Sequence, residues 1–156
     1  MNFWDAVKSC FRQYVGFQGR AARSEYWLWM LFNMVVSAVL HGLEGGMAEG
    51  VPGPLGSAWN IGTFLPSLAV AVRRLHDTER SGWWLMLPTG ALFAVGAATG
   101  ALTIGAPNGG GLSGIGAAVL GLAVLAWVGV MGLYLVWFCS CGTRGPNTFG
   151  ADPLAA

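Results

Sequence analysis

The sequence predicts an all-α membrane protein, with four transmembrane helices that follow an N-terminal interfacial amphipathic helix. Hydrophobic residues make up 54% of the 156 residues, and charged residues make up only 10%. Soluble proteins carry roughly 25% charged residues, so this chain has too few charges to cover a surface in water. Lipid admits only helices or closed barrels, and long apolar runs without period-two alternation favour helices.

The first predicted element is an amphipathic helix at residues 2–14, for which Asn2 is a candidate N-cap. Its apolar side chains share one helical face, and its polar side chains lie on the other. Such a helix lies in the membrane interface or packs as a cap on the cytosolic end of the bundle, and the sequence leaves both alternatives open. The apolar face holds Phe3, Val7, Cys10, Phe11 and Tyr14.

Four apolar runs follow as candidate spans; the second is short, and Arg73 and Arg74 could extend it by placing their charged groups at the interface. The first gives roughly 27 Å of helix, which is just enough to cross a bilayer. We expect its Asn33 to bond to a neighbouring helix, and we expect a kink at Pro66 in the second run, with Ser57 as the N-cap. The predicted spans are residues 26–43, 58–72, 83–104 and 115–138, followed by a cytosolic tail at 140–156.

The eight basic residues predict the orientation of the chain. They lie in the N-terminal segment, in the connection at 73–84 and in the tail, whereas the loops at 44–57 and 105–114 contain none. With four spans, the three basic segments share one side of the membrane. The positive-inside rule therefore places both termini in the cytosol and makes residues 1–156 a single multi-pass domain of the plasma membrane.

Three stretches carry a family resemblance: FQGRAARSEYW at 17–27, RRLHDTERSGWW at 73–84 after Pro66, and GPNTFGADP at 145–153. Together they resemble the bacterial inner-membrane family catalogued as domain of unknown function 805. The resemblance covers nearly the whole chain and implies a small multi-span protein of the inner membrane, with no established chemistry. Glu79 departs from the family motif, which has glycine at that position, so the geometry of this turn is open.

The candidate binding residues cluster in the basic segments. Arginine recognises phosphate through two parallel hydrogen bonds, so these side chains could contact an anionic phospholipid headgroup or a protein partner. The alternative is that they anchor the topology and pair with Glu25, Asp77 or Glu79. Arg73 and Asp77 would pair on one face if the second helix extends that far. The set comprises Arg20, Arg23, Arg73, Arg74, His76, Asp77 and Arg80.

His76 beside Asp77 suggests acid–base catalysis, but adjacent residues on a helix point about 100° apart. No nucleophile motif or phosphate-binding loop accompanies the pair. We therefore expect neither catalysis nor a cofactor, and instead a local role for His76, such as capping the connection or bonding to Asn147 or Asp152. A zinc site is not expected either, because the Cys-Ser-Cys spacing matches no common zinc motif; its candidate ligands are His76, Cys10, Cys139 and Cys141.

The function that the sequence favours is non-enzymatic: organising anionic lipid or a protein partner, which includes a homo-oligomer, at the cytosolic membrane face. The net charge of +1 argues against nucleic acid as a partner. The alternative is a small transporter or channel subunit, which Pro66, Asn33 and Asn60 suggest. Against this alternative, the predicted spans contain no Asp, Glu, Lys or Arg at mid-depth.

Overall fold

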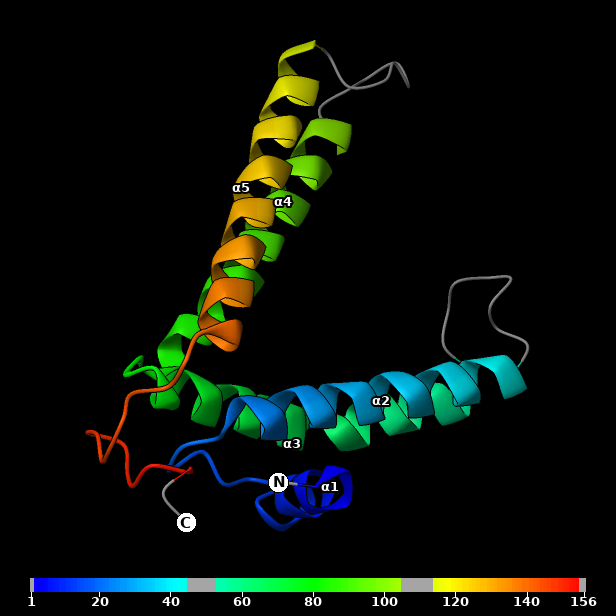
Figure 1. Ribbon diagram of the computed structural model, residues 1–156. Coiled ribbons are helices and arrows are strands. Elements are labelled where there is room, and N and C mark those ends of the chain that lie inside the picture. The colour runs from blue at the N-terminus through cyan, green and yellow to red at the C-terminus, as the bar shows by residue number, and fades with distance from the viewer. Residues whose placement is uncertain (1, 45–52, 105–113, 155–156) are drawn as a thin grey trace. The chain divides into compact units, whose positions relative to one another are not determined.

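The computed structural model describes residues 2–44, 53–104 and 114–154, and within these ranges the regular structure is helical. The residues form two compact units. The first unit combines Met1–Gly82 with Ser140–Ala156, and the α4–α5 unit is Trp83–Cys139. The helices are α1 (Phe3–Arg12), α2 (Arg23–Leu43), α3 (Pro54–Asp77), the 3₁₀-helix η2 (Gly82–Leu85), α4 (Met86–Ile104) and α5 (Gly114–Cys139) (Figure 1).

Three of the described helices are long and apolar enough to cross a membrane. They are α2, α3 and the stretch Ala118–Cys139 of α5. A further apolar helical stretch, Gly82–Ala97, is shorter within the described residues. The helices thus follow the predicted order, and the number of four crossings stays a prediction.

α3 begins earlier and ends later than the predicted span at 58–72. Its start is fixed by a carboxylate from the end of α2: Glu44 Oε1 accepts the Leu55 N–H at 2.5 Å, and Oε2 accepts the Gly56 N–H at 3.0 Å. A carboxylate at this end satisfies unpaired donors and complements the helix dipole. Ser57 therefore lies inside the helix, and the prediction that it is the N-cap is wrong.

Pro66 lies within α3 and removes one helical hydrogen bond, because proline has no N–H. The carbonyl that loses this partner belongs to Gly62, four residues earlier. In the structure the Tyr14 hydroxyl donates a hydrogen bond to the Gly62 carbonyl. The chain that follows α1 thus satisfies the acceptor that the proline leaves unpaired.

Replacing Tyr14 with phenylalanine is expected to lower the free energy of unfolding by about 1 kcal/mol, the usual size of such a bond between helices in a membrane protein. Thermal unfolding in detergent measures the change. The matched control repeats the substitution in a Pro66→Ala background, where the backbone N–H introduced by the alanine can reach the Gly62 carbonyl. If Tyr14→Phe costs as much there as in the native chain, the hydroxyl does not replace the missing helical bond.

α1 packs on α2 and α3 through its buried face. Cys10 is fully buried, and Val7 joins it in a core with Trp29 and Val70. Trp29 also ties α2 to α3, because its Nε1 donates to Ser67 Oγ at 3.0 Å. α1 therefore contributes to the core of the first unit.

Asn33 behaves differently from its prediction. Its Nδ2 donates to the Trp29 carbonyl of the same helix at 3.1 Å. The expected bond to a neighbouring helix is therefore wrong, because the carbonyl one turn earlier is already within reach of a short amide side chain.

The α4–α5 unit is a pair of adjacent helices (Figure 1). Tyr134 of α5 is 5% exposed, and its hydroxyl donates to the Trp84 carbonyl. The rings of Trp84 and Trp137 meet edge to face, with centroids 5.4 Å apart. Aromatic contacts and one interhelical hydrogen bond thus hold the η2 end of this unit together.

The end of α3 is a Schellman motif with an unusual residue at its left-handed position. The Arg80 N–H reaches the Leu75 carbonyl at 3.0 Å, and the Glu79 N–H reaches the His76 carbonyl at 3.1 Å. Glu79 has φ +58°, in the region that glycine adopts most easily. Glutamate therefore occupies, with some strain, a position that favours glycine.

Glu79→Gly is accordingly expected to stabilise the protein by about 0.5–1 kcal/mol, because glycine removes the steric cost of the left-handed conformation. Thermal unfolding in detergent is the measurement. Glu79→Ala is the control, since it removes the same charge but keeps the β-carbon, and it should give no such gain. Equal stabilisation by both substitutions would assign the effect to charge.

Candidate functional site

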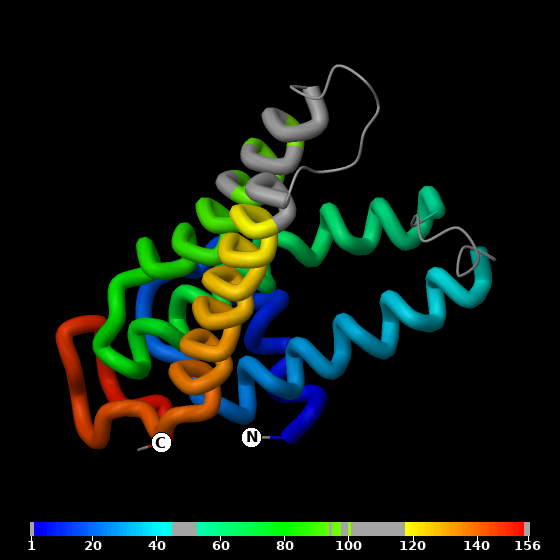
Figure 2. The backbone as a smooth tube through the Cα atoms, turned by 90° about the horizontal axis from the view of Figure 1, so that it is seen from above, coloured from blue at the N-terminus to red at the C-terminus, as the bar shows by residue number. Residues whose placement is uncertain are grey.

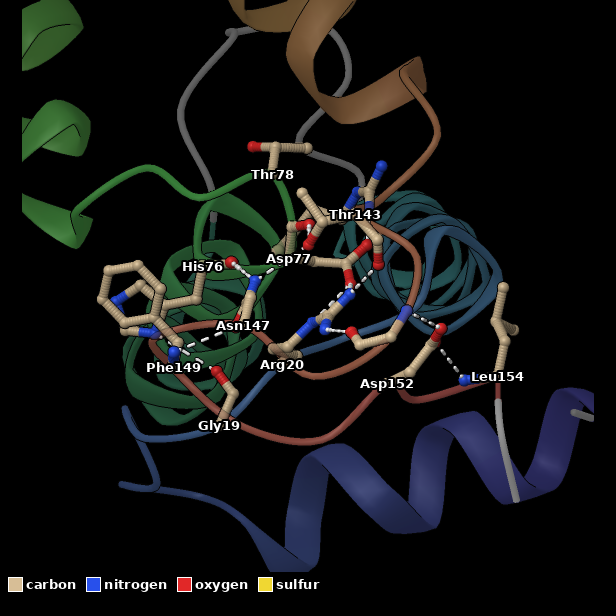
Figure 3. A network of polar contacts seen from close by, with 12 residues as sticks. Gly19, Arg20, His76, Asp77, Thr78, Thr143, Asn147, Phe149, Asp152 and Leu154 are labelled. Carbon is tan, nitrogen blue, oxygen red and sulfur yellow. Dashed lines mark hydrogen bonds and ion pairs between the residues drawn. The ribbon is translucent and has the colours of Figure 1, made fainter.

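The candidate site is built around Asp77, the last residue of α3. Its Oδ1 accepts a hydrogen bond from the Arg20 Nε at 2.9 Å (Figure 3). Its Oδ2 accepts a hydrogen bond from the Arg74 Nη1. Arg74 is 1% exposed, Asp77 3% and Arg20 8%, so these charges are withdrawn from solvent. A single buried carboxylate between two guanidinium groups offsets one of their two positive charges. We call Arg20, Arg74 and Asp77 the Asp77 cluster.

The tail completes the Asp77 cluster with backbone carbonyls. Arg20 donates to the carbonyls of Gly145 at 2.6 Å and Thr143 at 2.5 Å, and Arg74 Nη2 donates to that of Ser140. In return, the Thr143 N–H donates to the Asp77 carbonyl at 2.9 Å. The tail, orange to red, accordingly lies beside the blue segment before α2 (Figure 2).

Gly142 is the point of closest approach between the tail and the cluster. A β-carbon at this position would collide with the Asp77 carboxylate, which the two arginines hold in place. Gly142→Ala is therefore expected to cost about 1–3 kcal/mol, as other overpacked substitutions do, and to release the tail. Limited proteolysis within residues 140–154 measures the release. Gly145→Ala cannot serve as the control, because Gly145 has φ +77° and alanine would be strained there. A tail equally resistant in Gly142→Ala and in the native chain would contradict the assigned contact.

His76 is held by three separate contacts. Its Nδ1 donates to the Gly19 carbonyl at 3.2 Å, and its ring stacks on Phe149 with centroids 4.1 Å apart. Its main-chain carbonyl accepts the Asn147 Nδ2 at 2.9 Å, so His76 bonds to Asn147 through its backbone and not through its ring. The side chains of His76 and Asp77 thus bond to different partners, and the tail is anchored on both residues (Figure 3).

A second buried ion pair lies between α1, α2 and α3. Arg73 Nη1 is 3.0 Å from Glu25 Oε1, which also accepts the Ser9 hydroxyl at 2.9 Å. The predicted pairing of Arg73 with Asp77 is wrong, because the Arg73 side chain bonds to α2 and Asp77 is occupied by Arg20 and Arg74. Of the alternative pairings, the structure contains Arg73 with Glu25 and Arg20 and Arg74 with Asp77, and the role of the arginines as topology anchors stays a prediction.

Cys10 lies beside Glu25, with Sγ 4.0 Å from Oε1. Burial, and then the charge of the Glu25 carboxylate, raises the pKa of Cys10 to about 12. The thiol therefore stays protonated at neutral pH, which makes it a poor nucleophile and a poor metal ligand. Within the part of the chain that the structure describes, no three His, Cys, Asp or Glu side chains are placed to hold a metal ion.

A pocket of about 180 Å³ opens beside the Asp77 cluster. Arginines from three segments line it: Arg20 before α2, Arg23 at the start of α2 and Arg144 in the tail. Asp152 also lines it and accepts the N–H groups of Leu154 at 2.9 Å and Gly145 at 3.0 Å. These two hydrogen bonds hold the pKa of Asp152 below its ordinary value.

The predicted site residues thus separate into distinct environments. Arg73 lies in the Glu25 pair, Arg23 is exposed at the pocket, and Arg80 is half-buried with its Nη1 3.0 Å from the Thr78 carbonyl. Sequence reasoning missed Gly142, Thr143 and Arg144. Gly142 acts by leaving room for the Asp77 carboxylate, and Thr143 acts through its backbone N–H and carbonyl. Neither property is visible in a sequence, so only a three-dimensional structure identifies these two residues.

Comparison with known proteins gives a consistent result. The family model described as "Protein of unknown function (DUF805)" matches residues 14–151. The chain is 34% identical over 145 residues to "Inner membrane protein YhaI" of Escherichia coli strain K12, covering 93% of this chain and 92% of that protein. It is also 34% identical over 145 residues to "Inner membrane protein YhaH" of the same strain, covering 91% and 90%. No solved structure matches the chain.

Proposed function

We propose, from the premise that the chain belongs to the family of proteins of unknown function DUF805, that it is a non-enzymatic, multi-pass inner-membrane protein that organises anionic lipid at the cytosolic face. In this arrangement α2, α3, α4 and α5 cross the bilayer, and α1 lies at the interface. Both termini are cytosolic.

The observation that carries the proposal is that some basic residues are buried in ion pairs and others are exposed. Arg20, Arg73 and Arg74 are buried in ion pairs with Asp77 and Glu25, where their charge serves the fold. Four other basic residues are exposed on the same unit, and an exposed basic residue near the membrane surface contributes about 1 kcal/mol of attraction to anionic lipid. These residues are Lys8, Arg12, Arg23 and Arg144.

The geometry of His76 and Asp77 also supports a non-enzymatic role. A general base and its orienting carboxylate have to be within hydrogen-bond reach of one another. Here Asp77 is occupied by two arginines, and His76 is occupied by Gly19 and the Phe149 ring. Both side chains act as anchors for the tail.

Native mass spectrometry of the detergent-purified protein tests the proposal. The wild type is compared with a variant in which the four exposed basic residues become glutamine, which leaves the buried ion pairs intact. Wild type is expected to retain phosphatidylglycerol or cardiolipin, and the variant is expected to retain several-fold less. Equal retention by both would contradict the proposal, as would a wild type that retains a protein partner and no lipid. Matching thermal unfolding curves show that the variant is folded.

A further inference from the structure

We propose that the pocket beside the Asp77 cluster binds a phosphoryl group, from a phospholipid headgroup or a free phosphate, through Arg23 and Arg144. This inference rests on the proposed function and assigns its anionic ligand to one place on the protein. The pocket lies wholly within the first unit, because the loop before α2, the start of α2, the end of α3 and the tail form its walls.

The two carboxylates of the pocket carry less negative charge than the surrounding arginines carry positive charge. Asp77 is committed to Arg20 and to Arg74 behind it. Asp152 accepts backbone N–H groups of the tail. Three arginines and two aspartates line the pocket, and Arg74 adds a further positive charge through Asp77. The pocket is therefore cationic overall, and an anion would balance it.

Arg20 and Arg144 have different roles in this pocket. Arg20 already bonds to Asp77, Gly145 and Thr143, so it forms a fixed, positively charged wall. Arg144 is exposed, and within residues 2–44, 53–104 and 114–154 no group is bonded to its guanidinium. A guanidinium with its donors available at the rim can bind a phosphoryl oxygen pair in the two-pronged geometry that arginine favours.

The start of α2 adds backbone donors to the same place. Ala22 is the N-cap of this helix, lines the pocket and has no side-chain oxygen to cap the first turn. The N–H groups of the first turn and the positive end of the helix dipole therefore act with Arg23 to favour a negative ligand. The pocket volume is about 180 Å³, whereas a single water needs only about 10–15 Å³ measured in the same way. The pocket therefore has room for a hydrated phosphoryl group.

Cys141 supplies the measurement, because it lines the pocket and its thiol is exposed. In a Cys139→Ser background it is the remaining exposed cysteine, since Cys10 is buried. The quantity measured is the rate at which an uncharged maleimide modifies Cys141. One arm compares inorganic phosphate with sodium chloride of equal ionic strength in detergent. The other compares vesicles of phosphatidylcholine with vesicles that also contain phosphatidylglycerol.

Either ligand source is expected to slow modification several-fold, and the protection should vanish in Arg23→Gln/Arg144→Gln. Protection by phosphate identifies a free anion, and protection by phosphatidylglycerol vesicles alone identifies a headgroup. In the phosphate arm Lys8→Gln/Arg12→Gln is the matched control: it removes the same charge from α1, outside the pocket lining, and should leave the protection by phosphate intact. Absence of protection in the Cys139→Ser protein, or protection that survives when Arg23→Gln/Arg144→Gln is added to it, overturns the inference.

The two proposals fail in different ways. Lipid retention by native mass spectrometry without protection of Cys141 would leave the proposed function standing and place the lipid elsewhere on the basic surface. Protection by phosphate without lipid retention would support the pocket and count against lipid as the ligand. Loss of both signals would remove both proposals.

Discussion

Asp77→Ala is expected to lower the free energy of unfolding by about 3–5 kcal/mol, the typical cost of removing one partner from a buried ion pair. The substitution leaves two buried guanidinium groups, Arg20 and Arg74, without their shared carboxylate. The tail should also detach, because Arg20 binds the Gly145 and Thr143 carbonyls while Asp77 positions it. Thermal unfolding in detergent and limited proteolysis of residues 140–154 measure the two effects.

Glu79→Gln provides the control for Asp77→Ala. Glu79 is an exposed carboxylate two residues further along, so this substitution removes the same charge from the same turn without unpairing a buried arginine. We expect its effect on unfolding to be within about 0.5 kcal/mol of zero. If the two substitutions lower the unfolding temperature equally, the Asp77 cluster contributes no more than a surface charge does.

The second large effect concerns the pair formed by Arg73 and Glu25. Each single substitution, Arg73→Met or Glu25→Leu, is expected to cost about 3–5 kcal/mol, because it leaves an uncompensated charge between α1, α2 and α3. The double variant should cost far less than the sum. Arg73 Nε and Nη2 are buried without a hydrogen-bond partner among the described residues, so the native pair is incompletely satisfied and its replacement by apolar side chains loses little.

A double-mutant cycle on thermal or denaturant unfolding measures this coupling. The matched control is Ser9→Ala, which removes one hydrogen bond to Glu25 but leaves both charges paired, and which should cost about 1 kcal/mol. If the costs of the two single substitutions simply add in the double variant, the contributions of Arg73 and Glu25 to stability are independent. That outcome would contradict the ion pair inferred from their 3.0 Å separation.

The pairing of charges marks the limit of the sequence analysis. Local spacing suggested Arg73 with Asp77, since residues four apart share a helical face. The structure pairs Asp77 with Arg74, three residues away, and with Arg20, 57 residues away. Which of several acidic residues an arginine pairs with depends on which helix lies opposite it. Helical periodicity alone therefore does not predict the pair.

The boundaries of α3 show the same limit. Residues 54–57 contain proline, glycine and serine and suggest a loop. The carboxylate of Glu44, at the end of α2, accepts the N–H groups of Leu55 and Gly56 in the first turn of α3, and this lets the helix begin at Pro54. A cap supplied from another helix leaves no signature in the capped segment itself.

The sequence by itself determined the helical class, the order of the apolar helices, the family and the gathering of basic residues in the segments that make up the first unit. The family follows from the motifs at 17–27, 73–84 and 145–153. The other features follow from hydropathy and composition, which act over short stretches of chain. Only the tertiary structure decided which arginines are buried, which remain exposed, and that the tail's carbonyls surround Arg20 and Arg74. The physical reason is that burying a charge is favourable only where partners from distant segments meet it, and that meeting is a property of the folded chain.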